Sequence, residues 1–200
     1  QVGQPVYGRY STIAAKRPAP KKWTFSRSQF GFPLVGALSR IHRLTHAFGQ
    51  VEQVSAAATY WDTTVEGQPL NGESNGESED FYGACWVGAR LNFAAGPIFE
   101  VLYGKGDRFA QSERRLEVRG TDGTLIFKNS DGVLLREGEA IALEVGGKRG
   151  SFRRDTAAVL DAFLDQKPLY VTPQESLYSL QVADAARHAA ETHRIVNLLG

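Results

Sequence analysis

The sequence predicts an α+β fold, in which an open, mainly antiparallel β-sheet has helices packed on one face. First, β-branched and aromatic segments form one run in the middle of the chain, joined by tight glycine turns. Such short connections favour antiparallel pairing, because parallel strands need longer crossovers. Second, amphipathic helical segments precede and follow this run and do not alternate with it. Third, 42% of the 200 residues are hydrophobic and 22% are charged, which excludes a disordered chain or a coiled coil.

A strand, a loop, a helix and a second strand are expected in the first third of the chain. Residues 7–15 are aromatic and β-branched and predict a strand, and the two prolines within 16–22 predict a loop. Apolar residues then recur every three or four positions up to Gly49, which predicts an amphipathic helix. These apolar positions are Leu34, Leu38, Ile41, Leu44 and Phe48. Residues 51–63 return to strand chemistry.

A polar tract and a meander of strands are expected next. The sequence Asn-Gly-Glu-Ser at 71–74 recurs at once at 75–78, and such a polar repeat predicts a mobile loop. Turns at 95–97 and 104–106, followed by two Asp-Gly turns, then separate short strand-like segments. The expected strands are 81–94, 98–103, 115–119, 125–128, 133–136 and 141–145.

Two helices are expected at the end of the chain. Asp155 is suited to cap a helix whose apolar stripe is Val159, Leu160, Phe163 and Leu164. The residues Thr-Pro-Gln-Glu at 172–175 form a capping box with proline at the first helical position, the strongest local signal in the sequence. The helix that begins there is rich in alanine, which permits close packing.

The charge distribution is uneven and bears on possible partners. The first 51 residues hold eight of the 23 Lys and Arg residues and none of the 22 Asp and Glu residues. This basic segment is either a solvated face or a surface that meets an anionic ligand or an acidic domain. RNA-binding signatures and helix-turn-helix spacing are missing, so no nucleic-acid partner is expected.

Cellular context follows from the apolar runs and the cysteine count. No run reaches the roughly 18 to 20 apolar residues of a membrane span, and no signal peptide is recognisable, so we expect no membrane association and a cytoplasmic location. The single cysteine, Cys85, is expected to be a buried thiol.

Several chemistries are excluded by missing motifs. The glycines at 104–106 and 146–147 do not match a dinucleotide or phosphate loop and are interpreted as hairpin turns, so cofactor-binding residues remain unknown. No serine lies in a G-x-S-x-G elbow. His42 and His46 share a helix face at a spacing that metal ligands use, but no acidic residue accompanies them, so we expect no metal site.

The sequence resembles the C-terminal domain of the Gfo/Idh/MocA oxidoreductases over nearly its whole length. The segment Leu-Glu-Val-Arg-Gly-Thr-Asp-Gly-Thr-Leu at 116–125 carries most of the resemblance, supported by Phe-Arg-Arg-Asp at 152–155 and by the alanine-rich last helix. The resemblance implies that 1–200 is a single C-terminal α+β domain. It also implies an N-terminal Rossmann domain, absent from this chain, that binds NAD or NADP. No cofactor is then expected on this chain by itself, and a homo-oligomer is expected through the open sheet face.

The resemblance also implies where the substrate site lies. The family carries an Asp-Gly-His-Asp pattern at its first C-terminal-domain helix, and aligning on Gly49 places Val35, Ala37, Ser39 and His42 at these positions. All four differ from the family residues. His42 is the remaining candidate for catalytic proton transfer, since imidazole titrates near neutrality. Candidate substrate-binding residues are Ser39, Arg43, His46 and Trp23, with Trp23 as a flat wall for a sugar ring or a conjugated one.

Two functions are weighed. The leading prediction is the substrate-binding and oligomerisation domain of an NAD(P)-dependent oxidoreductase that acts on a sugar or related small molecule. The alternative is a catalytically silent relative that serves as a dimerisation or ligand-binding module, which the altered residues at 35, 37, 39 and 42 favour. A non-sugar substrate would also explain the altered residues, and the basic amino-terminal segment suits a carboxylated ligand.

Overall fold

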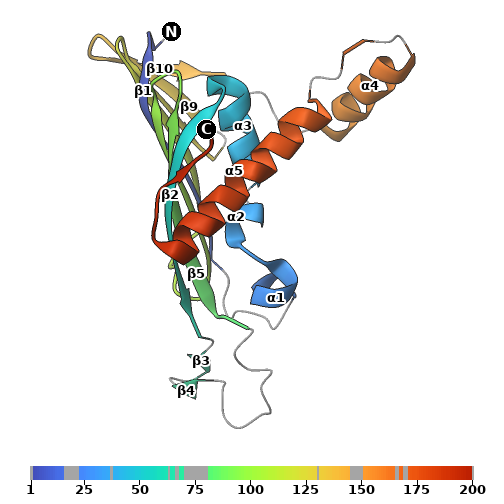
Figure 1. The fold of residues 1–200 in the computed structure, drawn as a ribbon. Helices are drawn as coiled ribbons and strands as arrows, with labels where there is room; N and C mark the ends of the chain where they lie inside the picture. Colours follow the sequence, from blue (N-terminus) through green and yellow to red (C-terminus); the bar gives the residue numbers. More distant parts are fainter. Residues whose placement is uncertain are drawn as a thin grey trace.

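The computed structural model describes residues 2–15, 23–36, 38–62, 64–65, 68–69, 81–129, 131–144, 151–164, 167–168 and 171–199. A nine-stranded sheet forms the body, and helices lie along one of its faces (Figure 1). The α+β class predicted from the sequence is therefore confirmed. The repeat at 71–80, predicted as a mobile loop, lies outside the described residues.

The sheet is antiparallel except at one pair of neighbours. Its order is β10-β9-β8-β7-β1-β6-β5-β2-β11. The strands are β1 Pro5–Ala15, β2 Val51–Trp61, β5 Ala84–Phe93, β6 Ile98–Gly106, β7 Glu113–Gly120, β8 Thr124–Lys128, β9 Asp131–Arg136, β10 Glu139–Leu143 and β11 Val196–Asn197. A separate ribbon pairs β3 Thr64–Val65 with β4 Gln68–Pro69. The first strand lies between β6, to which it is parallel, and β7, to which it is antiparallel.

Helices precede and follow the meander, as predicted. They are the 3₁₀ turn η1 Trp23–Phe25, α1 Arg27–Phe30, α2 Pro33–Gly36, α3 Leu38–Phe48, α4 Ser151–Leu164 and α5 Pro173–Thr192. The helix predicted over Leu34 to Phe48 corresponds to α2 and α3, and residue 37 between them lies outside the described residues. The helix α1 was not predicted, and its N-cap is Ser26, whose side chain accepts a hydrogen bond from the backbone N–H of Gln29 at 2.9 Å.

The longest helix begins at the predicted capping box. The Thr172 hydroxyl accepts from the N–H of Glu175 at 3.1 Å, and the Glu175 carboxylate accepts from the N–H of Thr172 at 2.8 Å. Buried small residues, among them Ala183 and Ala186, bring α5 close to the sheet at β2. The core lies between α3, α5 and the sheet.

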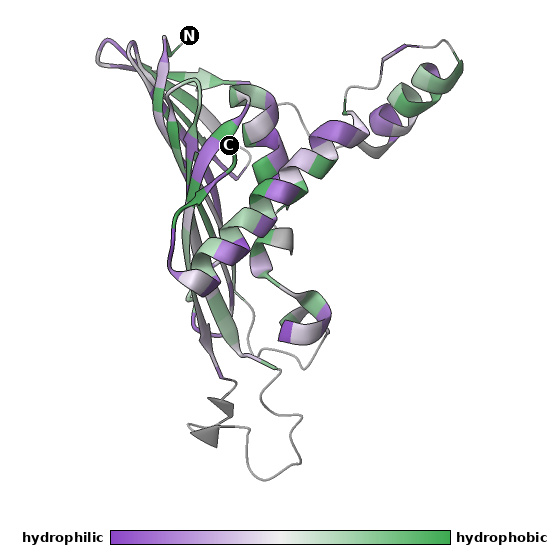
Figure 2. Ribbon diagram, viewed as in Figure 1, coloured by the Kyte–Doolittle hydropathy of each residue, from purple (hydrophilic) through white to green (hydrophobic). Residues whose placement is uncertain are grey.

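The helix α4 differs from its prediction. It begins at Ser151, four residues before Asp155, so Asp155 is within the first turns and does not cap it. The helix projects away from the sheet beyond the start of α5 (Figure 1), and hydrophobic residues occupy part of it (Figure 2). The side chains of its apolar stripe, Val159, Leu160, Phe163 and Leu164, are solvent-exposed. Within the described residues, no helix is long and apolar enough to cross a bilayer.

None of the helices that the structure describes lies over the second face of the sheet (Figure 1). Trp86 points to this open face and packs against Phe109, with ring centroids 5.8 Å apart. Phe93 and Phe99 lie buried on the helix side. Side chains alternate along a strand, so Trp86 and Phe93 of β5 cannot share a face. Gly8 on β1 leaves room for the Phe99 ring, which any Cβ at that position would displace.

The turn predicted at 104–106 is also wrong. The strand β6 continues to Gly106, and the side chain of Lys105 is buried on the helix side of the sheet. The thiol of Cys85, directly opposite in the register, is buried as predicted.

Candidate functional site

The helix α3 carries most of the residues predicted for the site and directs them to two different sides. His42 and His46 face α5. The Nδ1 atom of His42 lies 3.1 Å from the Ser179 hydroxyl, and Nδ1 of His46 lies 3.1 Å from a carboxylate oxygen of Glu175. The two imidazole rings stack with centroids 6.1 Å apart. The pair therefore joins α3 to the first turns of α5.

The surroundings of His42 are those of a helix–helix seam. Ser179 is buried and donates to the Glu175 carbonyl at 2.8 Å, and it lies 3.3 Å from the Thr45 hydroxyl. His42 thus has one ring nitrogen engaged between two helices. No substrate contact is shown for it, and proton transfer by His42 stays a prediction.

Arg43 lies on the other side of α3, over the first strand. Its guanidinium donates to the Tyr10 hydroxyl at 3.2 Å. One turn earlier, Arg40 is half-buried and donates to the hydroxyl of the exposed Ser39 at 3.2 Å. The two arginines and Ser39 thus belong to the border between α3 and the sheet, apart from the two histidines.

Burial and like charges act together on Arg40. Burial lowers the pKa of its guanidinium, and the positive charges of Arg114 and Arg43 lower it further. Tyr10 and Tyr103 are also close enough to interact with the Arg40 charge. Residues from four elements, α3, β1, β6 and β7, therefore lie around the Arg40 guanidinium. We call Arg40, Arg43 and Arg114 the arginine cluster.

Below the arginine cluster lies the sheet, at β1 and its two neighbouring strands, β6 and β7. Thr12 lies directly opposite Tyr103 on β6 and Arg114 on β7. It is 7% exposed, and its hydroxyl has no hydrogen-bond partner among the described residues. Buried polar atoms are nearly always paired in proteins, so this hydroxyl is available to a bound group. Burial also raises the pKa of Tyr103, which keeps its hydroxyl protonated and able to donate.

No ion pair involving the arginine cluster forms within the part of the chain that the structure describes, so its positive charge is uncompensated there. Guanidinium groups bind carboxylates and phosphates through two parallel hydrogen bonds, and partial burial strengthens such pairs. The arrangement is therefore suited to an anion such as a carboxylate or a phosphate.

Sequence reasoning missed most of these residues. Arg40 and Tyr10 lie in the basic amino-terminal segment that has no acidic residue, which is the only signal that pointed to them. Arg114 has no local signal. It reaches the cluster because β7 pairs with β1, with Arg114 opposite Thr12.

Trp23 is connected to this part of the sheet through Phe30, whose ring centre lies 4.0 Å from the ammonium of Lys105; on β6, Lys105 is two positions after Tyr103. Its side chain is 60% exposed, and its ring packs on that of Phe30 with centroids 5.6 Å apart. It therefore offers a flat apolar surface to solvent, and its role as a wall of the site stays a prediction. Lys21 and Lys22, expected to flank it, lie outside the described residues.

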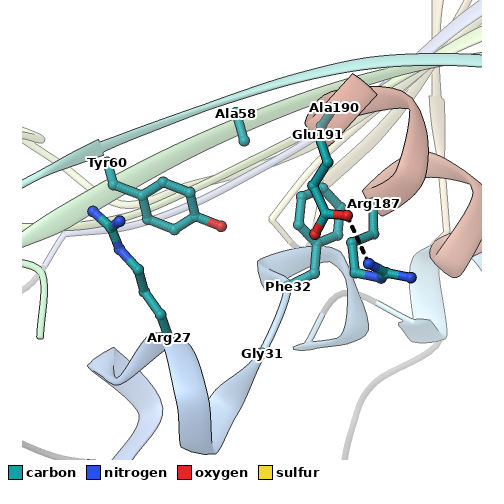
Figure 3. Close-up of a pocket in the computed structure, with 8 residues that line it drawn as sticks. All are labelled: Arg27, Gly31, Phe32, Ala58, Tyr60, Arg187, Ala190 and Glu191. Atoms are coloured by element: carbon teal, nitrogen blue, oxygen red, sulfur yellow. Dashed lines mark hydrogen bonds and ion pairs between the residues drawn. The ribbon is translucent and has the colours of Figure 1, made fainter. Parts of the chain in front are cut away.

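A separate pocket of about 400 Å³ lies between α1, β2 and the end of α5 (Figure 3). Its lining includes Phe32, Tyr60, Arg27, Arg187 and Glu191. Arg187 donates to Glu191 at 2.7 Å and to Asp184 at 2.8 Å. The Arg27 guanidinium lies 4.6 Å from the centre of the Tyr60 ring, whose pKa burial raises to about 12. The charge of Arg187 is compensated here, unlike that of the arginine cluster.

Metal ligands do not gather in the part of the chain that the structure describes. No group of three or more His, Cys, Asp or Glu side chains is placed to hold an ion there. Burial raises the pKa of the Cys85 thiol, which disfavours the reactive thiolate.

Comparison with known proteins agrees with this architecture. A family model described as the C-terminal alpha/beta domain of an oxidoreductase family, Gfo/Idh/MocA, matches residues 1–198. A structure of biliverdin reductase from Synechocystis sp. PCC 6803, in complex with biliverdin and NADP+, is 44% identical with a TM-score of 0.84. That match covers 95% of this chain and 56% of the reductase.

More distant structures share the fold. Levoglucosan dehydrogenase in complex with NADH and levoglucosan is 13% identical with a TM-score of 0.76, and the match covers 100% of this chain and 60% of that one. An oxidoreductase from Agrobacterium radiobacter in complex with NAD+, L-tartaric acid and magnesium is 12% identical with a TM-score of 0.65, covering 98% and 57%. The chain thus spans little more than half the length of these proteins. No match was found among curated proteins.

Proposed function

Because the chain belongs to the Gfo/Idh/MocA oxidoreductase family, we propose that it forms the substrate-binding and oligomerisation domain of an NAD(P)-dependent reductase whose substrate is a linear tetrapyrrole of the biliverdin type. The observation that carries the proposal is the arginine cluster, with its uncompensated charge on the helix side of β1. The 44% identity to a biliverdin reductase supports the choice of substrate.

The chemistry of biliverdin fits this place. It is an open-chain, conjugated tetrapyrrole with two propionate side chains, so it combines two carboxylates with a large flat apolar surface. The arginine cluster supplies guanidiniums for the carboxylates, and the hydroxyls of Tyr10, Thr12 and Tyr103 supply further hydrogen-bonding atoms beside them. Trp23 supplies an exposed aromatic surface against which a conjugated ring system packs.

This substrate replaces the sugar expected from the family resemblance. A sugar hydroxyl needs a general base, and the position that carries histidine in the family is Ser39 here. A conjugated carboxylated substrate makes different demands, namely neutralised carboxylates and a flat apolar wall. The altered family residues are thus accounted for without assuming a catalytically silent protein.

The nicotinamide dinucleotide supplies the hydride when it is bound. The described residues contain no consecutive parallel β–α–β unit with a glycine-rich turn at its helix N-terminus, which is what holds a dinucleotide pyrophosphate. We therefore assign the cofactor to a Rossmann domain of the full-length protein, with 1–200 as one C-terminal domain. Structures with NADP+ and NADH are known for the relatives that this chain half covers, which supports the assignment.

The open face of the sheet supports the proposed homo-oligomer. Trp61 and Trp86 both pack against Phe109 there, and Glu117 on the same face is held between Arg115 and Arg119 at 2.9 and 2.6 Å. An aromatic patch beside ordered charges is suited to an interface between copies of a chain.

The decisive experiment measures turnover by the full-length protein. Biliverdin and NADPH or NADH are mixed with the enzyme, and the loss of the visible absorption of biliverdin is followed. We expect saturable turnover that requires the cofactor, with levoglucosan as the matched alternative substrate. Turnover of levoglucosan and none of biliverdin would show that the proposed substrate is wrong.

A further inference from the structure

Lys105 is a buried cation in the middle of an aromatic cluster. Its side chain is 4% exposed, and its ammonium donates to the carbonyl oxygen of Thr24. The same nitrogen lies 4.0 Å from the ring centre of Phe30 and 4.6 Å from that of Phe25. Tyr82 adds a third ring, with its centre at 5.2 Å. Lys105 thus contacts the Thr24 carbonyl and the faces of these three aromatic rings.

Most of these partners belong to one short segment, residues 23–30. Tyr82 fastens the same segment, since its backbone N–H donates to the Phe25 carbonyl at 3.0 Å and its hydroxyl donates to the Thr24 carbonyl at 3.3 Å. The Thr24 carbonyl therefore accepts from both Lys105 and Tyr82. Lys105 connects this segment to β6, in the centre of the sheet.

A charge at this position is not needed to fill space. An apolar side chain of the same length would occupy the volume without the desolvation penalty of a buried ammonium. What only the charge provides is directional attraction, to a carbonyl oxygen and to the faces of aromatic rings. The ammonium therefore orients the Thr24 carbonyl and the Phe30 ring.

The Phe30 ring in turn supports Trp23. The two rings pack with centroids 5.6 Å apart, and Trp23 remains 60% exposed above Phe30. The Lys105 ammonium, the Phe30 ring and the Trp23 ring thus form a series of contacts that runs from the sheet to the surface. We propose that Lys105 is a positioning residue of the substrate site: acting through Phe30, it holds the segment 23–30 so that Trp23 presents its flat wall to the conjugated substrate. The substrate in this statement rests on the proposed function.

Lys105 itself has no route to the substrate, because it is almost fully buried beneath Phe30. Its effect is therefore expected in substrate binding and not in the chemical step. An interaction that holds ground state and transition state equally raises KM on removal and leaves kcat unchanged.

The test uses the full-length enzyme and compares Lys105→Met with Val101→Ala. Methionine keeps the unbranched shape without the charge. Val101 is buried on the same strand, β6, but packs in the main core and not in the cluster that contains Phe25 and Tyr82, so its truncation controls for general weakening. Hydrogen–deuterium exchange of the peptide covering 23–30 is measured first. We expect faster exchange there in Lys105→Met and no such local change in Val101→Ala.

Kinetics then test the link to Trp23. In Lys105→Met the KM for biliverdin should rise about tenfold, with kcat within about twofold of the wild type. Trp23→Ala should give a similar rise, and the double variant should show no further rise, since both act through one wall. Phe30→Leu, which keeps the lysine, should reproduce the effect and serves if Lys105→Met is poorly folded.

The outcomes separate the two proposals. Unchanged exchange at 23–30 in Lys105→Met would overturn the positioning role, whatever the substrate is. Additive effects of Lys105→Met and Trp23→Ala on KM would overturn its action through Trp23. A wild-type enzyme that does not turn over biliverdin would refute the substrate, and the exchange measurement would still decide whether Lys105 holds the segment.

Discussion

The guanidinium of Arg43 donates a hydrogen bond to the hydroxyl of Tyr10 at 3.2 Å, joining α3 to the first strand. The bond orients Arg43 over the sheet, on the side of α3 away from His42 and His46. The residues of α3 are therefore divided between two tasks: the histidines join α3 to α5, and the arginines face the place we assign to the carboxylates of the substrate.

Arg40→Gln should weaken biliverdin binding while leaving the protein folded. Glutamine keeps much of the length of arginine without its charge, and a hydrogen bond to a charged group contributes about 1.5–3 kcal/mol, so KM should rise about 10–100-fold. The matched control is biliverdin dimethyl ester, which has no free carboxylates. If Arg40 binds a carboxylate, wild type and variant should have similar KM values with the ester and different KM values with biliverdin. This result would place the substrate carboxylates at the arginine cluster. An equal loss with both substrates would argue against carboxylate binding by Arg40.

His42→Gln distinguishes a catalytic role from a structural one. A proton-transfer role predicts a fall in kcat of about 100-fold or more. The hydrogen bond to Ser179 favours the other outcome, in which kcat is retained and the free energy of unfolding falls by about 1 kcal/mol. We expect this second result, measured by steady-state kinetics together with urea denaturation. A large fall in kcat at unchanged stability would support the catalytic proton transfer by His42 that the sequence predicts.

Glu175 should make the fold sensitive to acid. Hydrogen bonds from the backbone N–H of Thr172, then from His46 and the Thr172 hydroxyl, lower the pKa of its carboxyl group. A carboxylate with a lowered folded pKa contributes stability that is fully present above its ordinary pKa of about 4.3 and is lost as the pH falls through the folded value. Glu175→Gln should therefore be less stable than wild type near neutrality, with the difference shrinking in acid. Denaturation curves over this pH range would show it, and a difference independent of pH would contradict it.

Trp86→Glu should dissociate the proposed oligomer. Trp86 lies on the open face against Phe109, so a charge there would be buried without a partner in a face-to-face assembly. We expect light scattering of the full-length protein to report a smaller species for Trp86→Glu, whereas Trp86→Phe, which keeps an aromatic ring, should retain the wild-type size. Equal sizes for all three proteins would exclude this face as the interface.

Local interactions explain which parts of the fold the sequence determined by itself. The capping box of Thr172 and Glu175 was predicted correctly, because its hydrogen bonds join residues three apart and need no partner element. The meander was predicted for the same reason, since tight turns leave antiparallel pairing as the remaining arrangement. Because successive side chains of a strand point to opposite faces of the sheet, the strand sequences also separate the residues of the two faces.

Only the tertiary structure decided which face each helix covers and which distant residues meet. Alternation separates Trp86 from Phe93 but does not say which of them faces the helices. The insertion of β1 between β6 and β7 brings Arg114 to Arg40, 74 positions earlier in the sequence. Lys105 looked like a turn residue, because glycines flank it, and became the buried anchor of 23–30 when β6 continued through it. Each of these depends on strand order and packing over long sequence separations, which local periodicity does not encode.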